Sequence, residues 1–128
     1  MNIKFESQKE FHRVNFDGMV SLKFNDDSYD CCQVKNLSLT GMFVKGNFQQ
    51  QVGDCLIKLF HREKCGNNSL QASGEIIWSN DEGVDLKFTT MSFENYILLQ
   101  TTLINKAEQP ATILRELPKD SPFEISSL

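Results

Sequence analysis

Five residues in the N-terminal part of the chain have types and a spacing suited to holding a small anionic ligand. Lys9 and Arg13 form a Lys-x-x-x-Arg pair, and Asn36-x-Ser38-x-x-Gly41 follows them. Arginine presents a planar fork of donors that matches phosphate oxygens and the N7/O6 edge of guanine. Asn36 and Ser38 can hydrogen-bond backbone or ligand, and Gly41 permits a positive φ or a close backbone approach. The pattern predicts a guanine-nucleotide site; the alternative is a solvated arm beside an ordinary turn or bulge.

The residues from 14 onward alternate between apolar and polar side chains, which is typical of half-buried β-strands. Clusters of Asn, Asp, Gly and Ser separate the alternating segments and indicate turns. Strands at this spacing indicate an all-β barrel or sandwich. Trp78 shares the parity of Ala72, Gly74 and Ile76, which predicts that its ring packs in the core. The six predicted strands lie at residues 19–24, 29–37, 42–44, 55–60, 70–79 and 84–88.

The pattern changes after Thr90, where a helix is predicted. Ser92 is a suitable N-cap, and apolar residues then recur at intervals of three and four, as in an amphipathic helix of about 14 residues. Three regions follow: an arm at 1–13 with the Lys-x-x-x-Arg pair, a β-domain with its helix at 14–106, and a tail at 107–128. We expect the tail to pack as a short helix or strand, or to be partly disordered. The expected apolar stripe of the helix is Phe93, Tyr96, Ile97, Leu99, Leu103 and Ile104.

The charge of the chain narrows the class of ligand. The 128 residues carry a formal charge of −4, which disfavours DNA or RNA as a partner. Residues 1–45 hold six basic and six acidic residues, so the region of the predicted site is neutral and can accept one small anion. No apolar run is long enough for a membrane span, and the N-terminus lacks the apolar region of a signal peptide. We therefore expect a cytoplasmic protein without membrane insertion.

The cysteines and histidines favour neither a metal site nor an enzyme. Cys31 and Cys32 are adjacent, so they face opposite sides of a regular strand, and the chain has no Cys-x-x-Cys pair. His61 and Cys65 lie in a predicted polar loop, where a thiol–base pair is a weaker interpretation than a solvated loop. No GxSxG, P-loop or HExxH motif is present. We expect no catalytic residues, no bound metal and no cofactor.

The order of these motifs resembles the PilZ domain, a bacterial receptor module for cyclic di-GMP. The family pattern is Arg-x-x-x-Arg before the first strand and Asp/Asn-x-Ser-x-x-Gly after the second, here Asn36 to Gly41. Gly74-Glu-Ile-Ile-Trp78 and Gly83-Val-Asp-Leu-Lys-Phe88 are similar to later strands of the family. The resemblance covers about residues 9–106. It implies a six-stranded antiparallel β-barrel with a C-terminal α-helix.

The resemblance also implies a function and a set of site residues. It implies a cyclic di-GMP receptor or adaptor that changes conformation or partner interaction when the nucleotide binds, with a protein partner that the sequence does not identify. The ligand-binding residues implied are Lys9, Arg13, Asn36, Ser38 and Gly41. Lys9 stands where the family has its first arginine, and lysine keeps the charge but loses the planar fork. The alternative is a degenerate PilZ domain that binds no nucleotide and acts as a protein–protein interaction module.

Overall fold

The computed structural model describes residues 2–5, 11–48, 52–61, 69–116 and 123–126. The helices in these ranges are α1 (Phe93–Lys106) and α2 (Pro110–Glu116). The strands are β1 (Asn2–Phe5), β2 (Val14–Asn15), β3 (Gly18–Lys23), β4 (Ser28–Leu37), β5 (Gly41–Lys45), β6 (Asp54–His61), β7 (Ser69–Ser79), β8 (Gly83–Ser92) and β9 (Phe123–Ser126).

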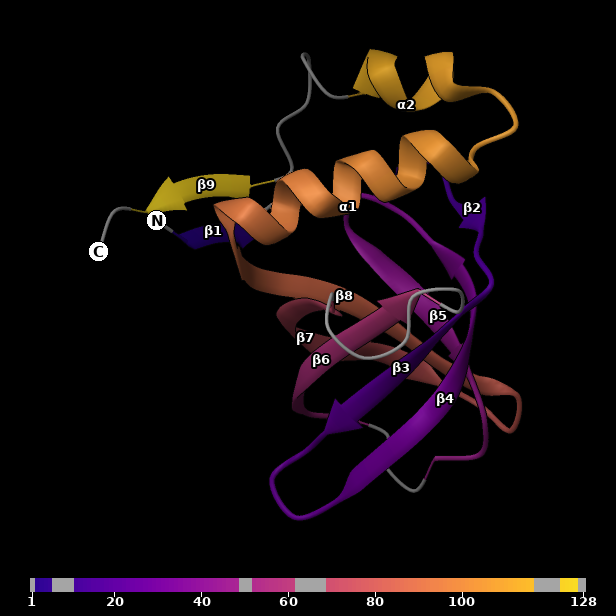
Figure 1. The fold of residues 1–128 in the computed structure, drawn as a ribbon. Coiled ribbons are helices and arrows are strands. Elements are labelled where there is room, and N and C mark those ends of the chain that lie inside the picture. The colour runs from indigo at the N-terminus through magenta and orange to yellow at the C-terminus, as the bar shows by residue number, and fades with distance from the viewer. Residues whose placement is uncertain (1, 6–10, 49–51, 62–68, 117–122, 127–128) are drawn as a thin grey trace.

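Six antiparallel strands close into a barrel (Figure 1). β3 pairs with β4 and β6, β6 pairs with β7, and β7 pairs with β8. β5 then pairs with both β8 and β4, which completes the ring. The apolar residues of the alternating strands fill the interior, where Leu22, Leu86 and Phe88 are almost fully buried. The ring consists of the six predicted strands, so the expected PilZ-type all-β barrel is confirmed.

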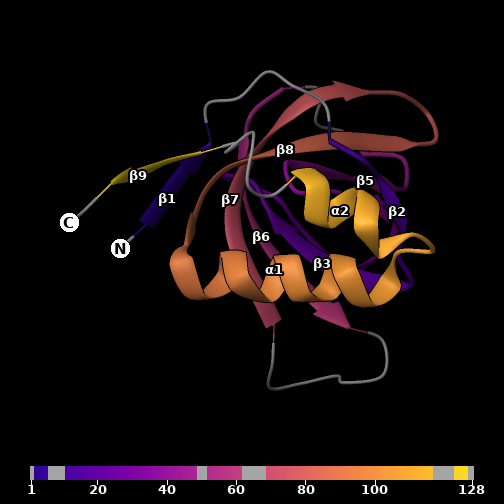
Figure 2. The same ribbon diagram turned by 90° about the horizontal axis from the view of Figure 1, so that it is seen from above.

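α1 lies across one end of the barrel, as Figure 2 shows from above. Its N-cap is Ser92, whose hydroxyl accepts a hydrogen bond from the Asn95 N–H at 3.2 Å. The predicted helix is confirmed, but its buried face is narrower than the predicted stripe, because Phe93 and Ile97 are each 43% exposed. None of the described helices is both long and apolar enough to cross a membrane. The buried residues of α1 are Tyr96, Leu99 and Leu103.

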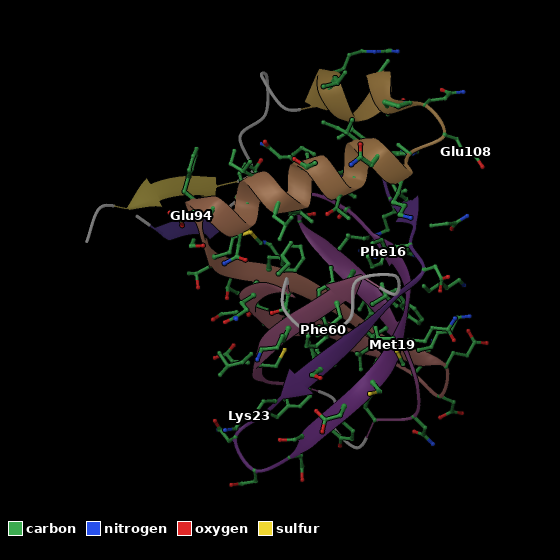
Figure 3. All side chains as sticks on the ribbon, in the orientation of Figure 1. Phe16, Met19, Lys23, Phe60, Glu94 and Glu108 are labelled. Atoms are coloured by element: carbon green, nitrogen blue, oxygen red, sulfur yellow. The ribbon has the colours of Figure 1, made fainter. Side chains whose placement is uncertain are left out.

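The arm contains a strand that the sequence pattern did not predict, and the described part of the tail contains α2 and β9. β1, in the arm, pairs with β8 on one side and with β9, in the tail, on the other. β1 and β9 therefore lie side by side at the edge of the sheet, although they come from opposite ends of the sequence (Figure 1). α2 packs on α1 through the buried Ile113. Glu94, in the first turn of α1, and Glu108, in the connection from α1 to α2, both lie above the barrel (Figure 3).

Cys31 has an unusual backbone conformation in β4. Its φ is +56°, and it is the one non-glycine residue with positive φ in the described part of the chain. The register between β3 and β4 shifts at this point, as in a bulge whose left-handed position glycine usually occupies. We expect Cys31→Gly to raise the free energy of unfolding by about 1 kcal/mol, because the left-handed conformation costs a side-chain-bearing residue about 1–2 kcal/mol. Urea denaturation followed by circular dichroism measures this change.

Gln33→Gly is a matched control for this prediction, since Gln33 is also exposed on β4 but has an ordinary φ. The control should destabilise the protein, because glycine in a strand interior loses more conformational entropy on folding. If both variants lost stability equally, the conformation assigned to Cys31 would be wrong.

Candidate ligand-binding site

The chain leading into the barrel holds Arg13 at a fixed place. Phe11, Val14 and Phe16 are buried in the core and anchor this segment on both sides of Arg13. β2 also pairs with the end of β4, with Asn15 opposite Asn36. These contacts bring Arg13, from before the first barrel strand, to the C-terminal end of β4. Figure 3 shows Phe16 at the end of the barrel that α1 covers and Lys23 at the other end of β3.

Four side chains form a row across neighbouring strands next to Arg13. Asn36 on β4 lies opposite Phe43 on β5, Phe43 lies opposite Asp85 on β8, and Asp85 lies opposite Trp78 on β7. The rings of Phe43 and Trp78 are 5.5 Å apart between centroids and tilted by 42°. The row therefore places an amide, a carboxylate and two aromatic rings on one face of the sheet.

Two β-bulges create this row. Lys35 is an extra residue of β4 relative to β5, immediately before Asn36, and Ile77 is an extra residue of β7 relative to β8, immediately before Trp78. An extra residue changes the parity of the strand beyond it, so the following side chain faces the other side of the sheet. The prediction that Trp78 packs in the core was therefore wrong. Ile76 is buried, but the Trp78 side chain is 45% exposed.

Arg13 is held by the row through a single nitrogen. Its Nη1 donates a hydrogen bond to Asn36 Oδ1 at 2.8 Å and lies 2.9 Å from Asp85 Oδ1. Both contacts lie at one end of the guanidinium, and the Arg13 side chain is still 37% exposed. The Nε–H and Nη2–H groups make no further hydrogen bond to a described residue. Two contacts thus orient the guanidinium and leave donors for a ligand.

A surface pocket of about 340 Å³ contains this arrangement. The Lys35 ammonium lies 5.7 Å from the centroid of the Phe43 ring and adds a second cation. Two cations and two carboxylates line the pocket, so its formal charge is zero. A larger hollow of about 740 Å³ along β3, β6 and β7 contains none of the predicted site residues. The full lining of the smaller pocket is Arg13, Lys35, Asn36, Phe43, Trp78, Glu82 and Asp85.

Ser38 and Gly41 shape the turn between β4 and β5, and neither is among the residues that line the pocket. The Ser38 N–H donates to the Gly41 carbonyl at 2.8 Å, and its hydroxyl accepts from the N–H groups of Thr40 and Gly41 at 3.1 Å each. Ser38 is only 1% exposed. At Gly41 an added Cβ would lie 2.0 Å from the Leu86 carbonyl oxygen, so only glycine fits there. The turn therefore fixes how β5 follows Asn36.

The motif turn, the closed barrel and the covering helix are the features that the sequence resemblance predicts. A PilZ domain model matches residues 7–105 of the 128. The chain belongs to the PilZ family. No curated protein matches it in a sequence comparison. PilZ domains form a receptor family for cyclic di-GMP, and they act as binding or adaptor modules rather than as enzymes.

The PilZ match includes every residue of the predicted site, but the structure does not describe all of them. It brings Arg13 and Asn36 into direct contact and places Ser38 and Gly41 in the turn that follows. Lys9 lies outside the described residues. Five residues that line this PilZ pocket were absent from the predicted site: Lys35, Phe43, Trp78, Glu82 and Asp85. The sequence signal for Trp78 was weak, because an aromatic residue near the end of a strand is also typical of the core.

The described cysteines of this PilZ domain do not form a metal centre. No group of three or more His, Cys, Asp or Glu side chains in the described ranges is placed to hold a metal ion. Cys55 is buried in β6, and this burial raises the pKa of its thiol to about 12. The Cys55 thiol therefore stays protonated at neutral pH and packs as a small apolar side chain. Cys65 lies outside the described residues.

Ser38 offers a direct test of the turn. We expect Ser38→Ala to lower the free energy of unfolding by about 1–3 kcal/mol, because it leaves the N–H groups of Thr40 and Gly41 without their acceptor. Urea denaturation measures the loss. Ser28→Ala removes an exposed hydroxyl from the start of β4 and should change stability by less than about 0.5 kcal/mol. Equal stability of the two variants would contradict the role of the Ser38 hydroxyl.

Proposed function

We propose that this PilZ domain binds cyclic di-GMP in the pocket around Arg13 and passes the bound state to a protein partner. The main support is the orientation of the Arg13 guanidinium, whose Nη1 contacts Asn36 and Asp85. Its Nε and Nη2 donors have no acceptor among the described residues. Such a guanidinium loses little freedom when it binds a phosphate or the N7/O6 edge of guanine. The family match supports the choice of nucleotide.

The other pocket residues supply what a cyclic dinucleotide needs besides Arg13. The exposed Trp78 ring offers a stacking surface, and base–aromatic stacking contributes about 1–3 kcal/mol per base. Lys35 adds positive charge for the phosphates. In this proposal Lys9 contributes a further cation from the arm, as the resemblance implies.

Asn36, Ser38 and Gly41 have different parts in the proposal. Asn36 lines the pocket, so it can contact the ligand and orient Arg13 at the same time. Ser38 and Gly41 are buried in the turn, so we assign their effect on binding to the shape of the motif rather than to direct side-chain contact. A substitution at either position would then change stability as well as affinity.

The proposed protein carries out no reaction on the nucleotide and needs no cofactor. Binding would change the surface around Arg13 and thereby create or hide a site for a partner, which is a common way to switch a signalling module. We place this receptor in the cytoplasm, where cysteine thiols are normally kept reduced.

The alternative is an interaction module that needs no nucleotide, and one observation favours it. The helical layer exposes several large apolar side chains, which a protein partner could cover. These side chains belong to Phe93, Ile97, Leu98 and Leu114.

Isothermal titration calorimetry of the full chain with cyclic di-GMP separates the two functions. The proposal predicts saturable heat below high micromolar nucleotide, with much weaker heat from GMP, which has the same base but lacks the macrocycle. Absence of heat with cyclic di-GMP at high micromolar concentration would reject the receptor function and favour the interaction module.

A further inference from the structure

The barrel exposes its large apolar side chains in one region, along β6 and β7. Val52, Leu56 and Ile77 have exposed fractions of 78%, 60% and 51%. Trp78, in the nucleotide pocket, follows Ile77 in the chain. The other large apolar side chains that are exposed in the described ranges belong to the two helices. Exposed apolar side chains that gather in one region indicate a surface that another molecule covers.

A pair of carboxylates lies between these apolar residues. Asp54 on β6 pairs with Glu75 on β7, and Leu56 follows two residues after Asp54, so it faces the same side of the sheet. Neither carboxylate makes a hydrogen bond or an ion pair with a described residue, although Lys87 on β8 is opposite Glu75 on the other side. Like charges directly opposite each other destabilise a sheet. The pair is therefore available to a cation from another molecule.

The apolar residues beyond the carboxylates continue the same register. The Ile76 N–H donates a hydrogen bond to the Gly53 carbonyl at 3.0 Å, one step beyond the carboxylate pair. Val52 and Ile77 are the next residues along the two segments, so they lie at the same level. Three levels follow one another on this β6–β7 surface: an apolar pair, a carboxylate pair and a single leucine. The β6–β7 surface consists of Val52, Asp54, Leu56, Glu75 and Ile77.

A hollow beside the β6–β7 surface leaves room for side chains of another molecule. Its volume is about 500 Å³, within the range of ligand pockets, and Asp54 and Leu56 are among the residues that line it. Lys23 on β3 pairs with Leu56 and also lines the hollow. Figure 3 shows Lys23 at the end of the barrel away from α1. The hollow is therefore separate from the helical layer.

The spacing of the three levels indicates the chemistry of a partner. Successive levels are two residues apart along β6, which corresponds to about 7 Å in a strand. An extended segment of another protein presents every second side chain on one face with the same spacing. A lysine or arginine at its centre would pair with the two carboxylates, and apolar residues two positions before and after it would cover the apolar levels. A nucleic acid or an anionic lipid surface would instead meet two like charges.

We propose that the β6–β7 surface binds an extended segment of a partner protein that carries a lysine or arginine between two apolar residues, each two positions away. The inference rests on the proposed function in one respect, because that function requires a protein partner. None of the five surface residues lines the nucleotide pocket, but Ile77 directly precedes Trp78, so the two sites adjoin. A bound nucleotide would thus lie next to the partner.

Selection of a random peptide library displayed on phage, with the full chain as target and no nucleotide present, tests this surface. The selected peptides should share a lysine or arginine with apolar residues at the second position on either side. Fluorescence anisotropy then measures the affinity of the strongest peptide, labelled with fluorescein. Glu75→Lys and Ile77→Ser should each weaken this affinity by about tenfold or more, since one reverses a central charge and the other removes an apolar contact.

Two matched controls lie in the helical layer. Glu108→Lys reverses an exposed carboxylate between α1 and α2, and Leu98→Ser truncates an exposed apolar side chain of α1. Both variants should bind the peptide within about twofold of the unchanged protein, because they lie outside the contact. A loss in Leu98→Ser that equalled the loss in Ile77→Ser would assign the partner to the helical layer and overturn the inference.

The remaining outcomes separate this inference from the proposed function. Selection of no peptide, selected peptides without the expected pattern, or equal affinity of Glu75→Lys and the unchanged protein would each overturn it. Peptide binding without calorimetric heat from cyclic di-GMP would support the β6–β7 surface and reject the receptor function, and heat without peptide binding would do the reverse. Circular dichroism establishes that the variants are folded, and Glu75→Gln provides the comparison if the lysine variant is not.

Discussion

Arg13→Ala should lower the affinity for cyclic di-GMP by about a hundredfold or more. The substitution removes every guanidinium donor from the pocket, including those that make no described protein contact. It also changes the balance of two cations and two carboxylates, so the formal charge of the pocket falls from zero to −1. Lost donors and added repulsion act in the same direction. Titration calorimetry of the variant beside the unchanged protein measures the effect.

Two further variants separate charge from shape in this prediction. Arg13→Lys keeps the positive charge but loses the planar fork, so it should weaken binding by only about tenfold. Arg115→Ala removes an exposed arginine from α2, outside the pocket, and should leave the affinity unchanged. If Arg13→Ala bound as tightly as the unchanged protein, the pocket would not be the nucleotide site.

Gly41→Ala should produce the largest loss of stability among the substitutions considered, about 3 kcal/mol or more. An added Cβ would lie 2.0 Å from the Leu86 carbonyl oxygen and 3.2 Å from the Lys87 Cα. Both atoms belong to the backbone of β8, which pairs with β5 on one side and β7 on the other and so cannot move away cheaply. Urea denaturation measures the difference in the free energy of unfolding.

Gly53→Ala is the matched control for Gly41→Ala. An added Cβ at Gly53 meets nothing within 4 Å, so the substitution costs only the strain of a residue with a φ of +136°. It should therefore destabilise the protein less than Gly41→Ala. A Gly41→Ala variant with normal stability and no nucleotide affinity would instead indicate that the glycine backbone contacts the ligand.

Local sequence patterns predicted the barrel strands and α1, but they did not predict the strands that extend the sheet. The alternation of apolar residues predicted the six barrel strands, and Ser92 with the following apolar spacing predicted α1. β1 and β9 are short: β1 pairs with β8 and β9, and β9 pairs with β1. Such pairing joins opposite ends of the sequence, and no local pattern records it.

Site residues could be predicted where their chemistry follows from the residue type. They could not be predicted where their position depends on how the strands pair. Arg13 and Asn36 were predicted from donor and acceptor capacity, and the structure brings them into contact. Asp85 occupied an ordinary polar position between apolar neighbours, and its relation to Arg13 depends on a fold that joins distant segments. Trp78 was assigned to the core because strict alternation was assumed, and one extra residue in β7 reverses its direction.

The bulge before Trp78 has a practical consequence, because the chain contains a single tryptophan. Its indole lies half-exposed in the pocket beside Phe43, Asp85 and Arg13. The intrinsic fluorescence of the protein therefore comes almost entirely from the place where a ligand would sit. A stacked base would quench this emission, and exclusion of water would shift it to shorter wavelength. The fold thus supplies its own optical reporter of pocket occupancy, with no label attached.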